Sequence, residues 1–141
     1  MNLIRFISNI LMVGSLLTAF SPNICRADDD EMYTLASALT KLSAAVESTV
    51  GFKDPLTELK DQELAVLSTR HNPKILAPFT DYVIKAFSQN KHAVVLICDK
   101  EGKLALLEDA GCTSPIDKHW WRDQPDKDCS ITITPAEVCQ D

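Results

Sequence analysis

Apolar residues recur at helical spacing in the first third of the chain. Between residues 31 and 50 they fall three or four positions apart, which places them on one face of an α-helix. Gly51 is a typical residue at the end of a helix. The pattern therefore predicts a first helix over residues 31–50, with an apolar stripe formed by Met32, Leu35, Leu39, Leu42 and Val46.

Two pairs of a capping residue and a proline mark the expected starts of two further helices. Asp54-Pro55 and Asn72-Pro73 each combine a helix-capping side chain with a proline at the first helical position. Leucines after the first pair predict a second helix to about residue 69. After the second pair, a stripe predicts a third helix that begins or kinks at Pro78 and ends at residue 90; its members are Ile75, Leu76, Phe79, Tyr82, Val83, Ala86 and Phe87.

The pattern changes to strands after residue 90. The β-branched and aliphatic run at residues 93–98 predicts a strand, and a turn at residues 99–102, with a positive φ expected at Gly102, leads to a return strand at residues 103–108. Residues 130–134 alternate apolar and polar side chains and predict another strand. Thr134 and Glu137 form a capping box that opens a last short helix through Cys139.

The order of these elements predicts an α+β fold. About three N-terminal helices pack on a small antiparallel sheet, which consists of a hairpin and one further strand, and a short C-terminal helix follows. Helices and strands are segregated along the sequence, which argues against a parallel doubly wound sheet. Three strands are few for independent stability. We therefore expect the helices to cover one face of the sheet and disulfides to secure the rest.

The first 27 residues have the pattern of a secretory signal peptide. Arg5 supplies a positive charge, an apolar stretch covers residues 6–20, and Cys25-Arg26-Ala27 places small residues where signal peptidase reads them. Cleavage after Ala27 would leave residues 28–141, a single disulfide-stabilised domain of 114 residues. We therefore expect a periplasmic or secreted protein with no membrane insertion after cleavage. A retained N-terminal anchor is the alternative.

The expected mature chain is acidic. It carries 12 basic and 20 acidic residues, which is a net charge of −8. An acidic surface repels nucleic acid and anionic lipid, because binding to either needs a cationic patch. It suits a basic protein partner. The charge also keeps a small domain in solution whether or not it has a partner.

The four cysteines of the expected mature chain lie in the last third of the full sequence, and in an oxidising compartment they predict two disulfides: Cys98, Cys112, Cys129 and Cys139. Of the three possible pairings we favour Cys112–Cys129, which closes the polar segment between them, together with Cys98–Cys139. The intervals of 13, 16 and 9 residues lack the short spacing of zinc ligands. We expect neither a metal site nor a cofactor.

The best candidate for a contact surface is the segment at residues 117–123. Trp and Arg often carry binding energy at interfaces, and a loop closed by a disulfide loses less conformational entropy on binding. Adjacent side chains on an extended segment point in opposite directions, so one indole can face outward. Alternatively, both tryptophans cover the small sheet as part of its core. The candidate partner-binding residues are Asp117, His119, Trp120, Trp121, Arg122 and Asp123.

The sequence offers little for catalysis. It contains no G-x-S-x-G nucleophile elbow, and its four glycines form no phosphate-binding loop. His71 and His92 have no neighbours in the sequence that would orient them, whereas His119 lies between Asp117 and Asp123. We therefore expect no enzyme and no catalytic residue. A small hydrolase or metal binder that uses His119 is the alternative.

These traits favour an exported protein that recognises another protein. An acidic surface, disulfide bracing and a Trp-Arg loop make the chain similar in type to small periplasmic inhibitors and immunity proteins, a similarity that no specific motif carries. Trp120, Trp121 and Arg122 would anchor the partner, and Asp117 and Asp123 would meet its basic groups. The alternative is a structural or assembly component of the cell envelope, in which the apolar stripe of the first helix contacts a partner helix. The sequence does not determine the oligomeric state.

Overall fold

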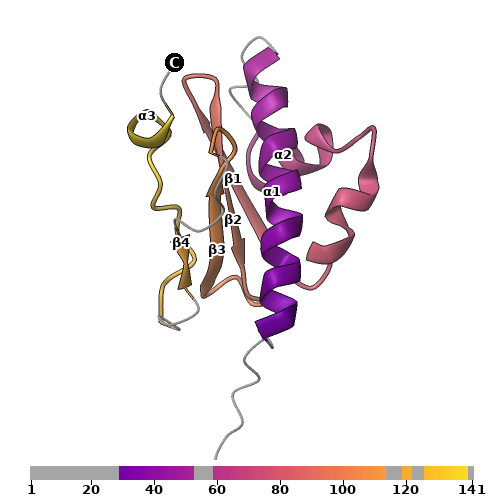
Figure 1. Ribbon diagram of the computed structural model, residues 1–141, viewed down its shortest axis with the longest axis vertical. Helices are drawn as coiled ribbons and strands as arrows, with labels where there is room; N and C mark the ends of the chain where they lie inside the picture. The colour runs from indigo at the N-terminus through magenta and orange to yellow at the C-terminus, as the bar shows by residue number, and fades with distance from the viewer. Residues whose placement is uncertain (1–28, 53–58, 114–118, 122–125, 140–141) are drawn as a thin grey trace, which may run out of the picture.

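The computed structural model of the chain describes residues 29–52, 59–113, 119–121 and 126–139. These residues form three layers, with helices on one face of an antiparallel sheet and an extended C-terminal segment on the other (Figure 1). The α+β class predicted from the sequence is confirmed. The expected signal peptide lies outside the described residues. Among the helices that are described, none has the length and apolarity needed to cross a bilayer.

The first helix, α1 (Asp29–Phe52), confirms the prediction for residues 31–50. Its apolar stripe faces the sheet, and every member is at most 6% exposed. The stripe is thus part of the chain's own core, which removes it as a surface for a partner helix. Tyr82 contacts the first turn of the helix, where its hydroxyl donates a hydrogen bond of 2.7 Å to Glu31.

The predicted second helix is present in part, and the third is wrong beyond residue 79. Residues 53–58 lie outside the described part, and α2 (Asp61–Ser68) follows them. Next comes a 3-10 helix, η1 (Pro73–Phe79), and the chain then enters strand β1 (Val83–Gln89) instead of continuing as a helix. Pro78 lacks an N–H and disfavours a regular helix through this segment. From residue 83 onward burial alternates with period two, with Ile84 and Ala86 beneath the helices.

The sheet has the order β1-β2-β3-β4, and all its pairs are antiparallel. Strand β2 (His92–Cys98) lies between β1 and β3 (Ala105–Ala110), and β4 (His119–Trp120) is a two-residue strand beside β3. The β2–β3 turn confirms the predicted hairpin, with Gly102 at a φ of 67°. Because β2 is central, both of its faces are buried: Val95 and Ile97 pack under the helices, and Val94 and Leu96 pack on the opposite face.

The C-terminal strap, which we define as residues 129–139, crosses the sheet on the face opposite to the helices (Figure 1). The strand predicted at residues 130–134 is wrong. The predicted alternation of apolar and polar side chains is nevertheless present, because Ile131 and Ile133 pack against the sheet. The backbone N–H groups of Thr132 and Ile133 donate to the Glu108 carboxylate rather than to another strand. The predicted last helix is present as α3 (Pro135–Val138), but the predicted capping box is wrong, because the Thr134 side chain makes no capping hydrogen bond.

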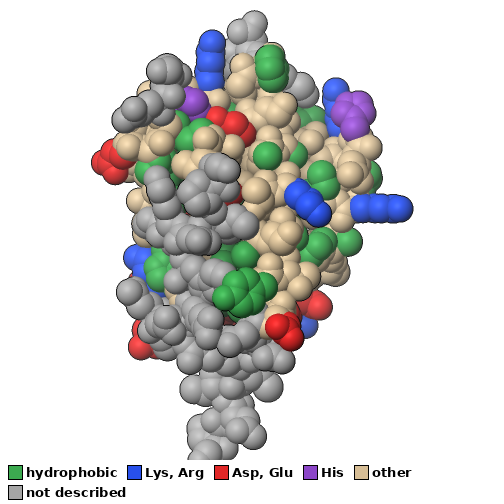
Figure 2. Space-filling view, viewed as in Figure 1, with side chains coloured by type: hydrophobic (Ala, Val, Ile, Leu, Met, Phe, Trp, Pro, Cys, Tyr) green, Lys and Arg blue, Asp and Glu red, His purple; other side chains and the backbone are tan. Residues whose placement is uncertain are grey.

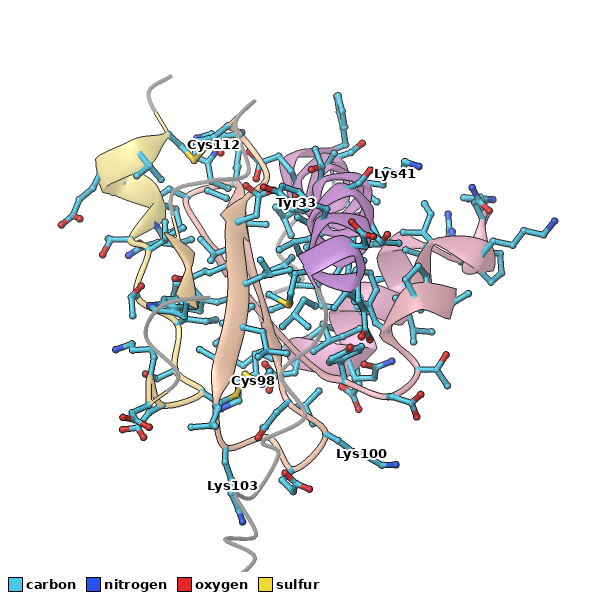
Figure 3. All side chains as sticks on the ribbon, turned by 60° about the horizontal axis from the view of Figure 1, so that its bottom comes forward. Tyr33, Lys41, Cys98, Lys100, Lys103 and Cys112 are labelled. Atoms are coloured by element: carbon cyan, nitrogen blue, oxygen red, sulfur yellow. A yellow bond between two sulfur atoms is a disulfide. The ribbon has the colours of Figure 1, made fainter. Side chains whose placement is uncertain are left out.

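Two disulfides fasten the strap at its two ends. Cys98–Cys129 joins the end of β2 to the start of the strap, and Cys112–Cys139 joins the segment after β3 to its end. Figure 3 shows Cys98 and Cys112 at opposite ends of the sheet. Two disulfides among these four cysteines are as predicted, but the favoured pairing, Cys112–Cys129 with Cys98–Cys139, is wrong. The prediction was based on the segment that a Cys112–Cys129 bond would close. The observed pairing instead follows from the path of the strap, which starts beside the end of β2 and finishes beside the segment after β3.

Candidate functional site

The segment predicted as a contact surface is described only in part. Asp117, Arg122 and Asp123 lie outside the described residues. The backbones of His119 and Trp120 form β4 and pair with Glu108 and Leu107 of β3. The proposed roles of these residues in binding or catalysis therefore stay predictions.

Trp121 lies partly inside the molecule. Its half-buried side chain packs against a cluster that contains both sulfurs of the Cys98–Cys129 disulfide, together with Leu96 and Ala105. This position fits both interpretations, because each has at least one tryptophan on the sheet, and the Trp120 side chain lies outside the described part of the protein. The buried part of this indole therefore contributes to the hydrophobic cluster between the sheet and the strap.

A groove with a volume of about 560 Å3 lies on the other side of the molecule, between α1 and η1. Ala38 of α1 and Ile75 and Pro78 of η1 give it apolar walls. Lys41 projects from the α1 side and Lys74 from the η1 side. Most of the lining side chains are exposed, so this is an open groove rather than an enclosed cavity.

The two lysines of the groove have no acidic partner among the residues that the structure describes. Among the described residues that line the groove there is no carboxylate, and the other polar side chains are the neutral Tyr33, Thr34, Ser37 and Asn72. Two ammonium groups beside an apolar surface make this a locally cationic site on a chain with a net charge of −6. An anionic group in the groove would meet positive charge from both walls.

The exposed side of α1 extends this surface beyond the groove. Among its exposed positions from residue 33 to residue 52, Lys41 is the one charged residue. Tyr33 is 60% exposed and Phe52 is 90% exposed, and between them lie the small residues Ala44 and Ser48. Figure 2 shows a mostly uncharged surface over α1, with basic side chains to its right. A long helix face with a single charged residue is unusual on the exterior of a charged protein.

A second hollow of about 460 Å3 lies between β1 and the strap. Its lining includes Phe87, Ile131 and Asp61. The Asp61 carboxylate accepts a hydrogen bond of 3.1 Å from the Ala86 N–H, which lies on β1 at the edge of the sheet. Because this edge donor already has a partner, the hollow is a poorer site for an added peptide strand than an open edge would be.

In the part of the chain that the structure describes, the two titratable groups with shifted pKa values, Asp109 and Tyr82, do not line the groove. Burial raises the pKa of Asp109 above its ordinary value, and hydrogen bonds from the hydroxyls of Ser43 and Thr113 oppose this shift. Burial, followed by the hydrogen bond to Glu31, raises the pKa of Tyr82 to about 12. Asp109 joins β3 to α1, and Tyr82 joins the residue before β1 to α1, so we assign both groups to the fold rather than to a reactive site.

The structure also assembles a cluster that sequence reasoning missed. His92 was predicted to have no orienting neighbour, but its Nδ1 lies 2.6 Å from Oε1 of Glu47, a residue 45 positions earlier in the chain. Oε2 of Glu47 accepts a hydrogen bond of 2.6 Å from the Ala93 N–H. The Cys112–Cys139 disulfide lies beside this pair. No local sequence signal reports a contact between a helix and a strand so far apart.

Comparison with known proteins finds no relative: no family model, no curated protein and no solved structure matches the chain.

Proposed function

We propose that this chain is an exported protein that binds a partner protein, and that the groove between α1 and η1 receives a short acidic segment of that partner. The observation that carries the proposal is the pair of lysines, Lys41 and Lys74, on opposite walls of an open apolar groove. The binding function is the one predicted from the sequence, but the proposed contact surface is the groove instead of residues 117–123.

The chemistry of the groove favours a carboxylate beside an apolar side chain. A carboxylate between Lys41 and Lys74 gains from both ammonium groups, and neither has to give up an acidic partner within the described part of the protein. An apolar side chain of the same segment would rest on Ile75 and Pro78. Burial of apolar area contributes affinity, and the charges contribute specificity and rate of association.

The openness of the groove favours a protein over a small ligand. Pockets for small molecules usually bury most of the ligand surface, whereas most residues that line this groove are exposed. The uncharged face of α1 continues past the groove as far as Phe52 and offers further contact area. A protein segment can cover both surfaces at once.

The acidic charge of the whole chain restricts the partner. A strongly acidic protein would be repelled, so the segment is expected to be a short acidic stretch within a neutral or basic protein. This is compatible with the basic partner expected from the sequence. A role in envelope assembly through the α1 apolar stripe loses its support, because that stripe is buried.

Two observations support export. The disulfides Cys98–Cys129 and Cys112–Cys139 are typical of oxidising compartments. The apolar stretch at residues 6–20, between Arg5 and Ala27, has the pattern of a signal peptide. We propose the periplasm or the extracellular space as the place of action.

The test is a peptide selection on the oxidised protein. Random peptides displayed on phage are selected for binding, and the best are synthesised and measured by fluorescence anisotropy. We expect enrichment of Asp and Glu next to apolar residues, and binding that weakens as salt is raised. The variant K41E/K74E should bind these peptides at least about tenfold more weakly, which corresponds to about 1.4 kcal/mol.

The matched control is K100E/K103E, which makes the same change of charge on the β2–β3 turn. Figure 3 shows Lys100 and Lys103 at this turn, away from Tyr33 and Lys41 on α1. The control should bind within about twofold of the original chain if the local charge of the groove decides affinity. Selected peptides without acidic residues, or equal loss of binding in both variants, would contradict the proposal.

A further inference from the structure

Four side chains with metal-binding atoms converge at the end of the sheet where the strap finishes. Glu47 comes from α1, His92 from the start of β2, Cys112 from the segment after β3, and Cys139 from the residue after α3. Each offers one ligand atom, and these four atoms lie within 4.8 Å of one another. Among the residues that the structure describes, this is the one group of its kind.

The size and composition of this group fit a tetrahedral zinc ion. Zn–S bonds of about 2.3 Å and Zn–N bonds of about 2.0–2.1 Å place tetrahedral ligand atoms roughly 3.3–3.8 Å apart. The imidazole and carboxylate atoms already lie within 4.8 Å of the two sulfurs, and the sulfurs, which are bonded to each other in the oxidised chain, move apart toward that spacing once the bond is broken. Thiolate and imidazole ligands select zinc over magnesium or calcium.

The Glu47–His92 contact prepares the imidazole for such a role. The carboxylate lies 2.6 Å from Nδ1 of His92 and is itself held by the Ala93 N–H. The contact holds the carboxylate and the imidazole side by side next to the two sulfurs, and Glu47 would exchange its contact with Nδ1 for the metal when zinc binds. Both side chains are partly buried, at 18% and 19% exposure, so they are held in place and can still be reached from solvent.

We propose that reduction of the Cys112–Cys139 disulfide converts this group into a zinc site, with Cys112, Cys139 and His92 as ligands and Glu47 as the fourth ligand. A dithiol reductant supplies two electrons and two protons. The sulfur–sulfur bond breaks, both cysteines become thiols, and the two thiols of the reductant become a disulfide. Zinc then binds the two sulfurs as thiolates and releases their two protons to solvent.

The other disulfide lacks these features. Cys98 is fully buried, and Trp121 packs against the cluster that contains Cys98 and Cys129. No comparable group of histidine and acidic side chains surrounds this pair among the described residues. Cys112, in contrast, is exposed, so a reductant can approach its sulfur. The two disulfides therefore differ in both access and surroundings.

The consequence is a strap that has two ways to stay attached. In the oxidised chain, a covalent bond holds the residue after α3 to the segment after β3. In the reduced chain, zinc holds the same two cysteines and adds His92 of β2 and Glu47 of α1. Reduction without zinc releases this end of the strap, while Cys98–Cys129 continues to hold the other. This inference is independent of the groove.

The test measures zinc binding to the full chain in the absence of oxygen. Protein is reduced with a dithiol, freed of the reductant, and titrated with Zn2+ against a chromophoric chelator, and in parallel with Co2+. We expect one equivalent of zinc in the reduced chain, and a cobalt spectrum with thiolate charge-transfer bands and intense tetrahedral visible bands. The oxidised chain should bind no zinc in the same range. Equal affinity of the two forms would overturn the proposal.

Paired variants locate the site. C98S/C129S keeps the proposed ligands and should bind zinc like the reduced original chain, whereas C112S/C139S should not. If circular dichroism shows that either double variant is unfolded, His92→Gln in the reduced original chain decides instead. Its zinc affinity should fall at least about tenfold. Unchanged affinity in His92→Gln, or zinc binding retained by folded C112S/C139S, would overturn the proposal.

Discussion

Glu108 accepts two hydrogen bonds from Thr132, one of 2.6 Å from the backbone N–H and one of 2.7 Å from the hydroxyl. It also accepts a bond of 3.2 Å from the Ile133 N–H, and its side chain is fully buried. The carboxylate thus takes the place of a neighbouring strand for this part of the strap. Together with the disulfides at Cys129 and Cys139, it fastens the strap at its start, middle and end.

Removing this carboxylate should loosen the strap between its disulfides. Glu108→Leu leaves the N–H groups of Thr132 and Ile133 without their acceptor, which is expected to lower the free energy of unfolding by about 2–3 kcal/mol. Urea unfolding measures this loss, and hydrogen exchange should be faster at both amides. Glu137→Gln, an exposed change on α3, is the control and should alter neither quantity. Unchanged exchange in Glu108→Leu would refute the role of the carboxylate.

Gly111 is expected to tolerate no side chain, because α1 lies directly against it. A Cβ at this position would lie 2.5 Å from the Ser43 carbonyl oxygen and 2.5 Å from the Glu47 Cβ. We predict that Gly111→Ala lowers the free energy of unfolding by about 1–3 kcal/mol through overpacking. The matched control is Gly51→Ala near the end of α1, where the nearest atom, the Lys91 carbonyl oxygen, is 3.8 Å away.

Gly51→Ala should be neutral or stabilise the protein by up to about 1 kcal/mol, since alanine is the better helix former. Chemical unfolding of both variants measures the contrast. Equal effects of the two substitutions would show that close packing against α1 is not what excludes a side chain at Gly111.

The sequence predicted the fold class because the strongest patterns belong to elements with one clear period. The α1 stripe runs over four turns, and β2 is too β-branched and too short for a buried helix. Residues 83–87 form a strand, although the sequence predicted a helix there. Over so short a run, the same apolar positions fit both the helical spacing and the alternation of a strand. Their pairing with β2, which no local pattern reports, decides the outcome.

The strap and the candidate sites were less predictable, for the same reason. Ile131 and Ile133 alternate as in a strand, but a buried side chain, Glu108, satisfies the backbone beside them. The groove depends on η1 lying against α1, and the Glu47–His92 pair joins residues 45 positions apart. The cysteine count predicted two disulfides, but their pairing depends on the direction in which the strap crosses the sheet.

Asp109 should make stability fall as the pH rises through its titration range. Its pKa is raised above 3.8 by burial, so the folded chain keeps this proton to higher pH than the unfolded chain does. Between those two pKa values, stability relative to Asp109→Asn should decrease with increasing pH and then become constant. Urea unfolding across the acidic range measures both chains. Parallel curves for the two would contradict the shifted pKa.

Asp61 combines an unusual backbone with a bond to the edge of the sheet. Its φ is 50°, a conformation that Asp and Asn tolerate better than alanine, and its carboxylate accepts the Ala86 N–H. We expect Asp61→Ala to lower the free energy of unfolding by about 1–2 kcal/mol. Asp61→Asn keeps both the acceptor and the tolerated conformation, so it should remain close to the original chain. Equal losses in the two variants would contradict this explanation.

The central claim is that two disulfides hold the strap across the sheet, and peptide mapping without reduction tests it most directly. Trypsin alone leaves Cys129 and Cys139 in one peptide, but cleavage after Glu137 by a glutamate-specific protease separates them. The account predicts that the peptide of residues 92–100 is linked to that of residues 128–137, and the peptide of residues 109–118 to that of residues 138–141. A link between Cys112 and Cys129, or free thiols at all four positions in protein purified without reductant, would contradict it.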